Sequence, residues 1–403
     1  MGRKAFLLAL GFVFILCSVS YVQAKDKIVI GAARSLSGPL ATIGDSAFRP
    51  VYEIWVEKVN KAGGIYVKEY GKKLPVELKI YDDKSDMATM TRLLEKVIVD
   101  DKVDLLFPPV STGFLFAAAP IANKHKKLLV GCEGGATKLK ELIPRLPYVF
   151  ASLNFSDHNQ VPVLVDLLAD AGAKSAAIIF MGDLHGIEYS SVEAPLLTTK
   201  GIDVKFMKSV PPGIKDLSPL LREAKRLKVD VLIVNGYPDE VILTTKQLME
   251  IDFNPKALVL GPGGNFGFYK KIFGPAAEGV IGFGAWNCKT PGMKEFCDVF
   301  FSKYGEDRTD WWGHFFYWAW LQFLEKAIEK TGSIDNDKLR EVFAEEKLDT
   351  SVGKIWFDEH HLMAKECHPG EIGQWQKGMF EVVGPKDKAT AKFIYPKPPW
   401  PKK

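Results

Sequence analysis

The feature that most constrains the fold is a repeated alternation of short apolar runs with longer amphipathic stretches. The apolar runs predict strands at residues 28–33, 76–81, 103–107, 128–130, 176–181, 204–208, 231–235, 257–260 and 280–283. The stretches between them predict helices at 45–61, 87–100, 112–124, 160–171, 217–227 and 239–250. Alternation at this spacing is typical of βαβ units with parallel sheets, and near-continuous apolar strands indicate that helices cover both sheet faces. We therefore expect an α/β fold.

The strands fall into two series, which predicts two sheets. A chain of 403 residues is too long for one compact core. The first four strands end near residue 130, a Gly- and Pro-containing linker spans 133–153, and the second series runs to about 285. Helices are predicted next at 291–304, 312–330 and 335–345, followed by β-like segments at 354–357, 371–376 and 379–383. Residues 385–403, rich in Pro and Lys, are predicted to be a surface tail.

The first 24 residues have the pattern of a signal peptide. Arg3 and Lys4 precede an apolar run at 5–16, and Val22-Gln23-Ala24 places small residues where a signal peptidase reads them. The run is short for a membrane span. We expect export to the periplasm with cleavage after Ala24; an uncleaved anchor and a lipid on Cys17 are the alternatives.

Composition limits the partners of the exported chain. Hydrophobic residues make up 47% and charged residues 25%, as in ordinary soluble domains. Cleavage after Ala24 removes two basic residues and lowers the formal charge from +4 to +2. Such a balance argues against nucleic acid, which requires a concentrated basic face. Four cysteines remain, and Cys288 and Cys297 are closest in sequence, but the sequence leaves the disulfide connectivity open.

The loops after the strands are the expected place for a ligand. In open α/β sheets, ligands lie beyond the carboxyl ends of the strands. The loops at 108–113 and 131–137 each place hydroxyl groups near a helix start, with Ser111 and Thr112 in the first and Thr137 in the second. Free backbone N–H groups beside hydroxyls suit a carboxylate, and plain helix capping is the alternative.

A series of short motifs runs through most of the chain in a fixed order. The motifs are Ser37-Gly38-Pro39, Asn60-Lys61-Ala62-Gly63-Gly64-Ile65, Tyr81-Asp82-Asp83, Gly135-Ala136-Thr137, Asn235-Gly236-Tyr237, Gly261-Pro262 and Ala276-Ala277-Glu278-Gly279. Each motif is weak alone, but their order and spacing are specific. Together they resemble the leucine/isoleucine/valine-binding proteins of bacterial ABC transporters, and the likeness covers nearly all of residues 28–383.

The resemblance implies two Rossmann-like lobes that are joined by three crossovers and close on a ligand between them. Lobe one would comprise residues 25–156 plus 286–355, and lobe two residues 157–285 plus 356–403. The implied function is that of an extracytoplasmic solute-binding subunit of an ABC importer, capturing an amino acid or a related small carboxylate or amide. Its implied partners are membrane permease subunits; we expect a monomer, no cofactor and no enzymatic activity.

The resemblance also assigns ligand-binding positions. Ser111, with Thr112 beside it, and the pair Ala136 and Thr137 stand where the family holds the ligand carboxylate. Ile43 stands at an aromatic position of the first loop. The remaining positions are His185, at an aromatic position of lobe two, and Tyr237, which keeps the family's tyrosine.

Gly263 is the departure that matters most. It stands where the family has the acid that pairs with the ligand ammonium, and an ammonium buried without a partner is costly. Either another acid replaces it, or the ligand lacks an α-amino group; the candidate acids are Glu133, Asp157, Asp183 and Asp239. We expect a roomier site, and that Leu, Ile and Val are not the best ligands. The alternative is an aliphatic amino acid held by Glu133 or Asp239.

The late aromatic stretch at 311–320 is expected to be mostly core. Trp311 and Trp312 precede the predicted helix, and Trp312 is placed at the edge of the cleft as a platform for a flat ligand.

Two other classes of function are the alternatives, and the first is an enzyme. The segment 261–267 nearly matches a dinucleotide-binding loop, but Phe266 replaces the third glycine. His360, His361, Cys367 and His368 fit no standard zinc spacing. The second class is a ligand-binding component of a sensory system, because receptors reuse this fold.

Overall fold

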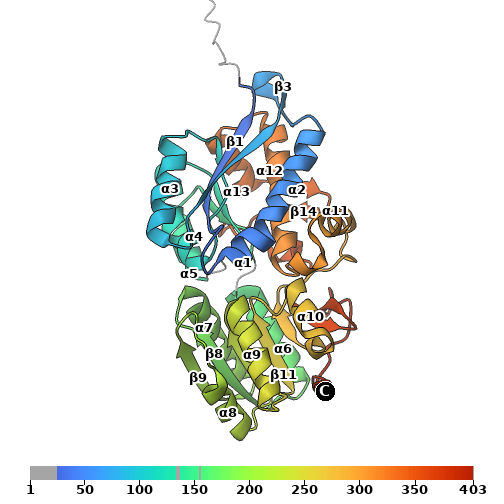
Figure 1. Cartoon of the computed structure of the whole chain (residues 1–403). Coiled ribbons are helices and arrows are strands. Elements are labelled where there is room, and N and C mark those ends of the chain that lie inside the picture. The colour runs from blue at the N-terminus through green and yellow to red at the C-terminus, as the bar shows by residue number, and fades with distance from the viewer. Residues whose placement is uncertain (1–24, 133–136, 154–155, 403) are drawn as a thin grey trace, which may run out of the picture.

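The chain folds into two α/β lobes stacked end to end (Figure 1). The structure, a computed structural model, describes residues 25–132, 137–153 and 156–402. The predicted signal peptide lies outside the described residues. No helix within these ranges combines the length and apolar character needed to cross a membrane.

Lobe one is built on a parallel sheet of order β4-β1-β5 with the parallel pair β6–β7 beside it. Its strands are β1 (Ile28–Arg34), β2 (Ile65–Val67), β3 (Lys72–Leu74), β4 (Val76–Asp82), β5 (Leu105–Leu106), β6 (Leu129–Gly131), β7 (Val149–Ala151), β13 (Leu348–Thr350) and β14 (Gly353–Ile355). Its helices are α1 (Ala41–Ile43), α2 (Arg49–Lys61), α3 (Met87–Val99), α4 (Thr112–Lys124), α5 (Thr137–Leu142), α11 (Lys294–Tyr304), α12 (Gly313–Thr331) and α13 (Asn336–Glu345).

Lobe two contains a seven-stranded sheet of order β16-β15-β12-β11-β10-β8-β9, in which β15 and β16 are antiparallel. Its strands are β8 (Ser175–Met181), β9 (Asp203–Val210), β10 (Val231–Asn235), β11 (Ala257–Gly261), β12 (Ile281–Phe283), β15 (Ile372–Gln376) and β16 (Met379–Gly384). Its helices are α6 (Val161–Asp170), α7 (Leu184–Thr199), α8 (Ser218–Arg226), α9 (Pro238–Glu250) and α10 (Gly267–Phe273). Helix α7, which packs against β8, β9 and β10, was not predicted from the sequence.

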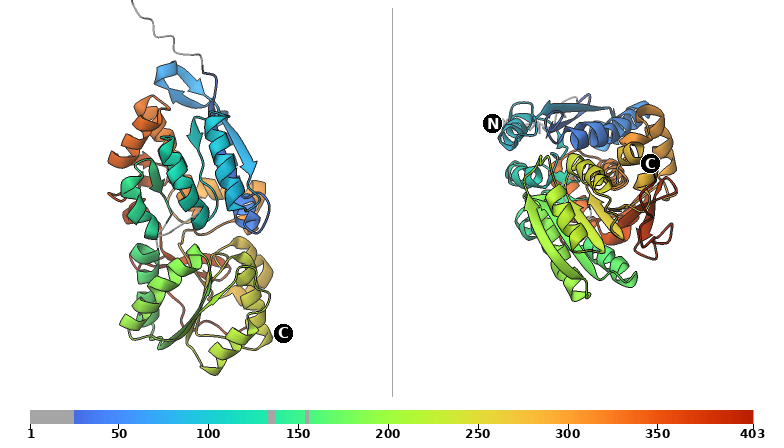
Figure 2. Two further views of the ribbon diagram at one scale, coloured as in Figure 1. Left: turned by 90° about the vertical axis from the view of Figure 1, so that its left-hand side faces the viewer. Right: turned by 60° about the horizontal axis from the view of Figure 1, so that its bottom comes forward.

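The chain passes between the lobes three times, after β7, after β12 and after β14, as Figure 2 makes visible from two further directions. After β14 it still pairs with β7, because Met363 N–H donates to Ala151 O at 2.8 Å. It then joins the lobe-two sheet at β15. The predicted two-lobe α/β fold is confirmed by these pairings, while the residue boundaries of the lobes stay predictions.

Helix α12 forms the aromatic core of lobe one. Trp318 and Trp320 are 3% and 1% exposed, so the aromatic stretch is core as expected. Phe107 packs between Tyr52, with ring centroids 4.2 Å apart, and Trp320, with centroids 5.5 Å apart. Aromatic rings fill large volumes with few rotatable bonds, which fixes α12 against β5 and α2.

The cysteine pairing and the C-terminal segment are settled by the tertiary structure. Cys288 and Cys297 form a disulfide, while Cys132 and Cys367 are buried thiols. Residues 385–402 lie largely on the surface, as expected, but they are not a loose tail. Lys397 is 4% exposed, and Trp400 Nε1–H donates to Phe253 O at 2.9 Å, so this segment packs on lobe two.

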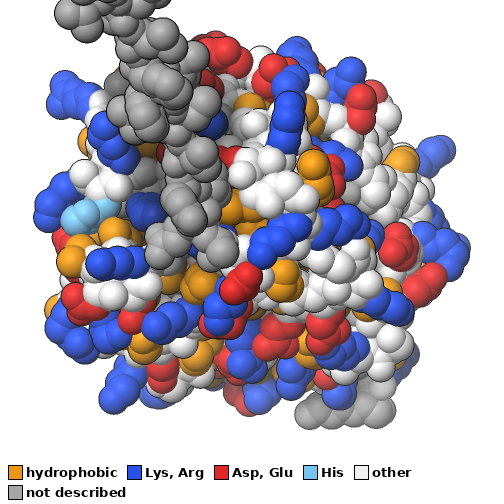
Figure 3. Space-filling view, turned by 90° about the horizontal axis from the view of Figure 1, so that it is seen from above, with side chains coloured by type: hydrophobic (Ala, Val, Ile, Leu, Met, Phe, Trp, Pro, Cys, Tyr) orange, Lys and Arg blue, Asp and Glu red, His pale blue; other side chains and the backbone are white. Residues whose placement is uncertain are grey.

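Charges of both signs are interspersed on the face seen from the lobe-one end (Figure 3). The pattern on that face agrees with the small net charge. It provides no concentrated basic surface there of the kind that binds nucleic acid.

Candidate ligand-binding site

A partly open cavity of about 50 Å³ lies where the two lobes meet. Six of the predicted site residues line it, and both lobes contribute. The predicted residues on its wall are Ile43, Ser111, Thr112, His185, Tyr237 and Trp312; the others are Phe48, Val110, Cys132, Leu153, Pro262, Phe266, Asp310 and Gly313. No Lys or Arg is among these described lining residues. An anion in this cavity would have to be held by hydroxyl groups and backbone N–H groups.

A wider cavity of about 440 Å³ lies next to the first and shares Ser111, His185 and Tyr237 with it. Its wall comes from the starts of α3 and α4 in lobe one and of α7 and α9 in lobe two. Asp183 and Asp239, two of the acids considered as partners for an ammonium, lie on this wall. The shared residues place it as the mouth of the inner cavity.

The start of α4 leaves its first backbone N–H groups without a side-chain cap. Ser111 is its N-cap residue and has φ 81°, a left-handed conformation that is uncommon for a residue with a side chain. Its side chain caps none of the first backbone N–H groups, and the first turn contains no acidic residue. The first N–H groups of a helix lack intrahelical partners and carry partial positive charge. The α4 terminus therefore presents unneutralised donors to the cavity.

Three other helices that begin at the cavities are already neutralised by the protein's own carboxylates. Asp183 accepts a hydrogen bond from Gly186 N at the start of α7, at 2.9 Å. Glu240 accepts one from Tyr237 N at the start of α9, at 3.2 Å. Asp310 accepts one from Trp312 N before α12, at 2.9 Å. Among these helices, α4 is the one whose start still offers its donors to an anion.

His185 and Tyr237 form the lobe-two side of the cavity. The Tyr237 hydroxyl donates to Asp183 Oδ2 at 2.7 Å, and this bond together with burial raises the pKa of Tyr237 well above its ordinary value. The ring centroids of His185 and Tyr237 are 5.6 Å apart. Burial lowers the pKa of His185, so its imidazole is neutral at physiological pH.

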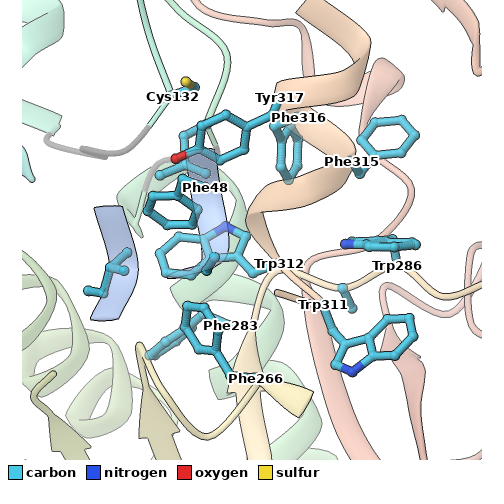
Figure 4. Packing of buried hydrophobic residues seen from close by; sticks show 14 of the residues in the cluster. Phe48, Cys132, Phe266, Phe283, Trp286, Trp311, Trp312, Phe315, Phe316 and Tyr317 are labelled. Carbon is cyan, nitrogen blue, oxygen red and sulfur yellow. The ribbon is translucent and has the colours of Figure 1, made fainter. Parts of the chain in front are cut away.

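Trp312 lies between the lobes, with Phe48 on one side and Phe266 on the other (Figure 4). A Cβ atom on Gly284, whose φ is 58°, would lie 1.9 Å from Trp312 Cδ1, so the indole packs directly on the backbone that follows β12. With its amide nitrogen facing Tyr189, Gln160 accepts a hydrogen bond from Trp312 Nε1 at 3.1 Å. Trp312 thus contacts the cavity and two of the interlobe segments at once.

Asp310 is a lining residue that the sequence argument missed. It is 1% exposed, and its Oδ1 accepts a hydrogen bond from Asn265 Nδ2 of lobe two at 2.6 Å. Burial raises its pKa to about 7. The available signal was an Asp shortly before a predicted helix, which is the usual position of a helix-capping residue.

Gly263 does not lie on the cavity wall. A Cβ atom there would sit 3.0 Å from Pro238 Cα and 3.2 Å from Val241 Cβ, so the residue faces α9. The expectation that this glycine makes the site roomier is therefore wrong. Glu133 and Ala136 lie outside the described residues, as do the side chains of Thr137, which opens α5, and Asp157.

The features that suggested other chemistry have structural explanations. The near-dinucleotide loop is covered by residues 306–311, since Gly267 N donates to Thr309 O at 2.8 Å and Trp311 N donates to Asn265 O at 3.2 Å. His361 Nδ1 lies 3.0 Å from Val149 O, and His368 Nδ1 lies 2.9 Å from Glu371 Oε1. No group of three or more metal-ligating side chains is found within the described residues.

Comparisons with known proteins agree with the fold. The sequence model of the periplasmic binding protein family matches residues 27–378. The leucine-, isoleucine-, valine-, threonine- and alanine-binding protein of Pseudomonas aeruginosa is 27% identical over 346 residues, covering 84% of this chain and 88% of that protein.

Two solved structures share the architecture. A leucine-binding protein of Thermotoga maritima has a TM-score of 0.75 at 21% identity, covering 89% of this chain and 99% of its own. An ABC-transporter solute-binding protein of Rhodopseudomonas palustris BisB5, in complex with 3,4-dihydroxybenzoic acid, has a TM-score of 0.75 at 21% identity, covering 94% and 99%. Proteins of one fold thus bind solutes as different as an amino acid and an aromatic acid.

Proposed function

This chain belongs to the periplasmic binding protein family, and from that premise we propose that it captures a small carboxylate outside the cytoplasm and delivers it to the permease of an ABC importer. It acts as a monomer in the periplasm after cleavage behind Ala24, and it binds and releases its solute without chemical change. The ligand is enclosed when the two lobes close.

The observation that carries the proposal is the uncapped start of α4 inside a cavity with walls from both lobes. The Ser111 hydroxyl caps no backbone N–H group of α4. Ser111 has a left-handed backbone conformation, which is strained for a residue with a side chain, and it lies on the cavity wall. A ligand carboxylate at this point would accept hydrogen bonds from the hydroxyl and from backbone N–H groups of α4. The neighbouring helix starts, held by Asp183, Glu240 and Asp310, would repel a second anion and so orient the ligand.

The body of the ligand would lie against apolar and aromatic walls. Ile43, Phe48, Phe266 and Trp312 surround the cavity, and each is less than 9% exposed. Flat or branched apolar groups both suit such walls. We propose an aromatic or extended carboxylate ahead of Leu, Ile and Val. Asp183 already holds two hydrogen bonds and Asp239 is exposed at the mouth, so neither is poised to pair with an ammonium in the inner cavity.

Ser111→Ala tests the carboxylate assignment. Charge-assisted hydrogen bonds contribute about 1.5–3 kcal/mol, so affinity for the best acid of a calorimetric panel should fall by about tenfold or more. The panel should contain benzoate-type acids, short amides, Phe, Leu, Ile and Val. Ser218→Ala, at the start of the distant helix α8, is the matched control and should bind as the unaltered protein does. Unchanged affinity in Ser111→Ala would contradict the proposal.

A further inference from the structure

Gln160 is a buried amide whose side chain takes no part in its own helix. It directly precedes α6 of lobe two, and its side chain caps none of the N–H groups of that helix. It is fully buried, and it is not among the described residues that line the cavity. A buried amide needs hydrogen-bond partners within the protein, and those partners show what the residue does.

The surrounding groups fix the orientation of the Gln160 amide. Two donors, the Gly284 backbone N–H and Trp312 Nε1–H, face the same end of the amide, so the oxygen belongs at that end. It accepts hydrogen bonds from Trp312 at 3.1 Å and from Gly284 at 3.3 Å, while the amide nitrogen donates to the Tyr189 hydroxyl. Because Trp312 precedes α12 of lobe one, this amide links lobe two to a residue of the cavity wall.

Trp312 is confined at two further points. Its backbone N–H donates to Asp310 Oδ1 at 2.9 Å, and the same oxygen accepts from Asn265 Nδ2 of lobe two at 2.6 Å. The indole also packs on the Gly284 backbone, where a Cβ atom would lie 1.9 Å from Trp312 Cδ1. Gln160 therefore supplies the polar contact that completes the confinement of this ring.

The Gln160 contact lies beside the crossovers between the lobes. Gln160 ends the segment that follows β7, and Gly284 directly follows β12. Positions next to the axis of a hinge are displaced least when two lobes separate. We therefore expect the hydrogen bond from Trp312 to persist when the lobes open, so that the indole is in place before a solute arrives.

We propose that Gln160 is a positioning residue for solute binding, because its amide oxygen fixes the Trp312 indole in the cavity wall. This rests on the proposed function, since it assumes a solute in the cavity. Gln160 does not touch the solute. It raises affinity by removing the need to order the Trp312 ring when the solute binds.

A double-mutant cycle tests whether Gln160 acts through Trp312. Gln160→Met keeps a side chain of similar length and removes the acceptor. Calorimetry with benzoate, phenylalanine and leucine should show the affinity for the tightest-bound of these acids falling by about tenfold. In Trp312→Phe, which has no indole N–H, adding Gln160→Met should change that affinity by less than about twofold. An equal fall in both backgrounds would mean that Gln160 only supports the fold and would overturn the inference.

A measurement without solute separates this inference from the proposed function. In protein labelled with ¹⁵N-tryptophan, the indole signal that Trp312→Phe removes belongs to Trp312. In Gln160→Met this proton signal should move upfield, and its exchange with water should become about tenfold faster. Gly284→Ala should have the same effect because its Cβ displaces the indole, whereas Gly71→Ala, with φ 66° and no atom within 4 Å of the added Cβ, is the control.

The two proposals fail in different ways. A Trp312 signal that is unchanged in Gln160→Met would overturn the inference whatever the acids do. Failure of benzoate, phenylalanine and leucine to bind the unaltered protein would count against the proposed function, and the Trp312 signal would still decide the position of the indole.

Discussion

At the scale of single residues, this protein stabilises buried carboxyl groups in their neutral form. Glu193 of α7 is fully buried, and its Oε2 accepts a hydrogen bond from Asn235 Nδ2 at 2.7 Å. Its Oε1 and the Asn235 Oδ1 have no partner among the described residues. Burial raises the pKa of Glu193 to about 8. A protonated carboxyl group supplies the donor that this pair of oxygens lacks.

Glu193→Gln should remove a pH dependence of stability. A raised folded-state pKa means that the stabilisation is complete below the ordinary value of 4.5 and is lost as the pH rises toward 8. The free energy of unfolding of the variant, relative to the unaltered protein, should therefore increase by about 3 kcal/mol between pH 5 and pH 8. Urea unfolding at both pH values measures it, with the part-exposed Glu329→Gln as control. Parallel pH profiles for the two proteins would refute the neutral-carboxyl interpretation.

At the scale of elements, the C-terminal segment acts as part of lobe two. Gln374 Nε2 in β15 donates to Ile394 O at 2.9 Å, and Lys397 Nζ donates to Asn254 Oδ1 at 2.7 Å. Trp400 reaches the loop after α9 through Phe253 O. A segment rich in Pro and Lys forms no helix or strand, yet these contacts anchor it to β15 and to the loop between α9 and β11.

Trp400→Ala should destabilise the protein by about 2–3 kcal/mol, because it removes the packing of the indole and one hydrogen bond. Trp400→Phe should cost about 1 kcal/mol, since it keeps most of the apolar area and loses only the N–H group. Thermal and urea unfolding measure both, and Lys402→Ala at the exposed end is the control. A loss no larger than that of the control would mean that the segment is a loose tail after all.

At the scale of the whole molecule, the cavity requires both lobes. Its wall contains Ser111 from lobe one and His185 from lobe two, and α4 contacts α7 across the mouth. We expect the lobes to separate for a solute to enter, and a ligand that contacts both lobes would favour the closed arrangement.

Small-angle scattering should record this closure. The radius of gyration of the unliganded protein should exceed that of the protein saturated with its best acid, because ligand contacts from both lobes stabilise the compact state. Ser111→Ala at the same acid concentration should stay expanded, since it loses affinity. An unliganded protein that already has the compact radius, with no change on saturation, would contradict this prediction.

The sequence by itself determined the layered architecture and much of the site. Strand and helix periodicity are local properties, so most strands and most helices fall where the pattern predicts them, whereas the short strands β2, β3, β7 and β13 were not predicted. Residues that follow parallel strands must gather at one sheet edge, and this rule predicted Ser111, while the family resemblance predicted Tyr237; both lie on the cavity wall.

The tertiary structure decided what local patterns do not encode. Helix α7 escaped prediction because its buried face carries polar residues such as Glu188 and Glu193, whose partners are distant in sequence. Asp310 lies on the cavity wall and is hydrogen-bonded to Asn265, and Gly263 faces α9. Both orientations depend on packing between elements that are separate in sequence. Periodicity reports which residues are apolar along one element; only the assembled lobes determine which buried polar atoms have hydrogen-bond partners and which, like His185 Nε2, have none among the described residues.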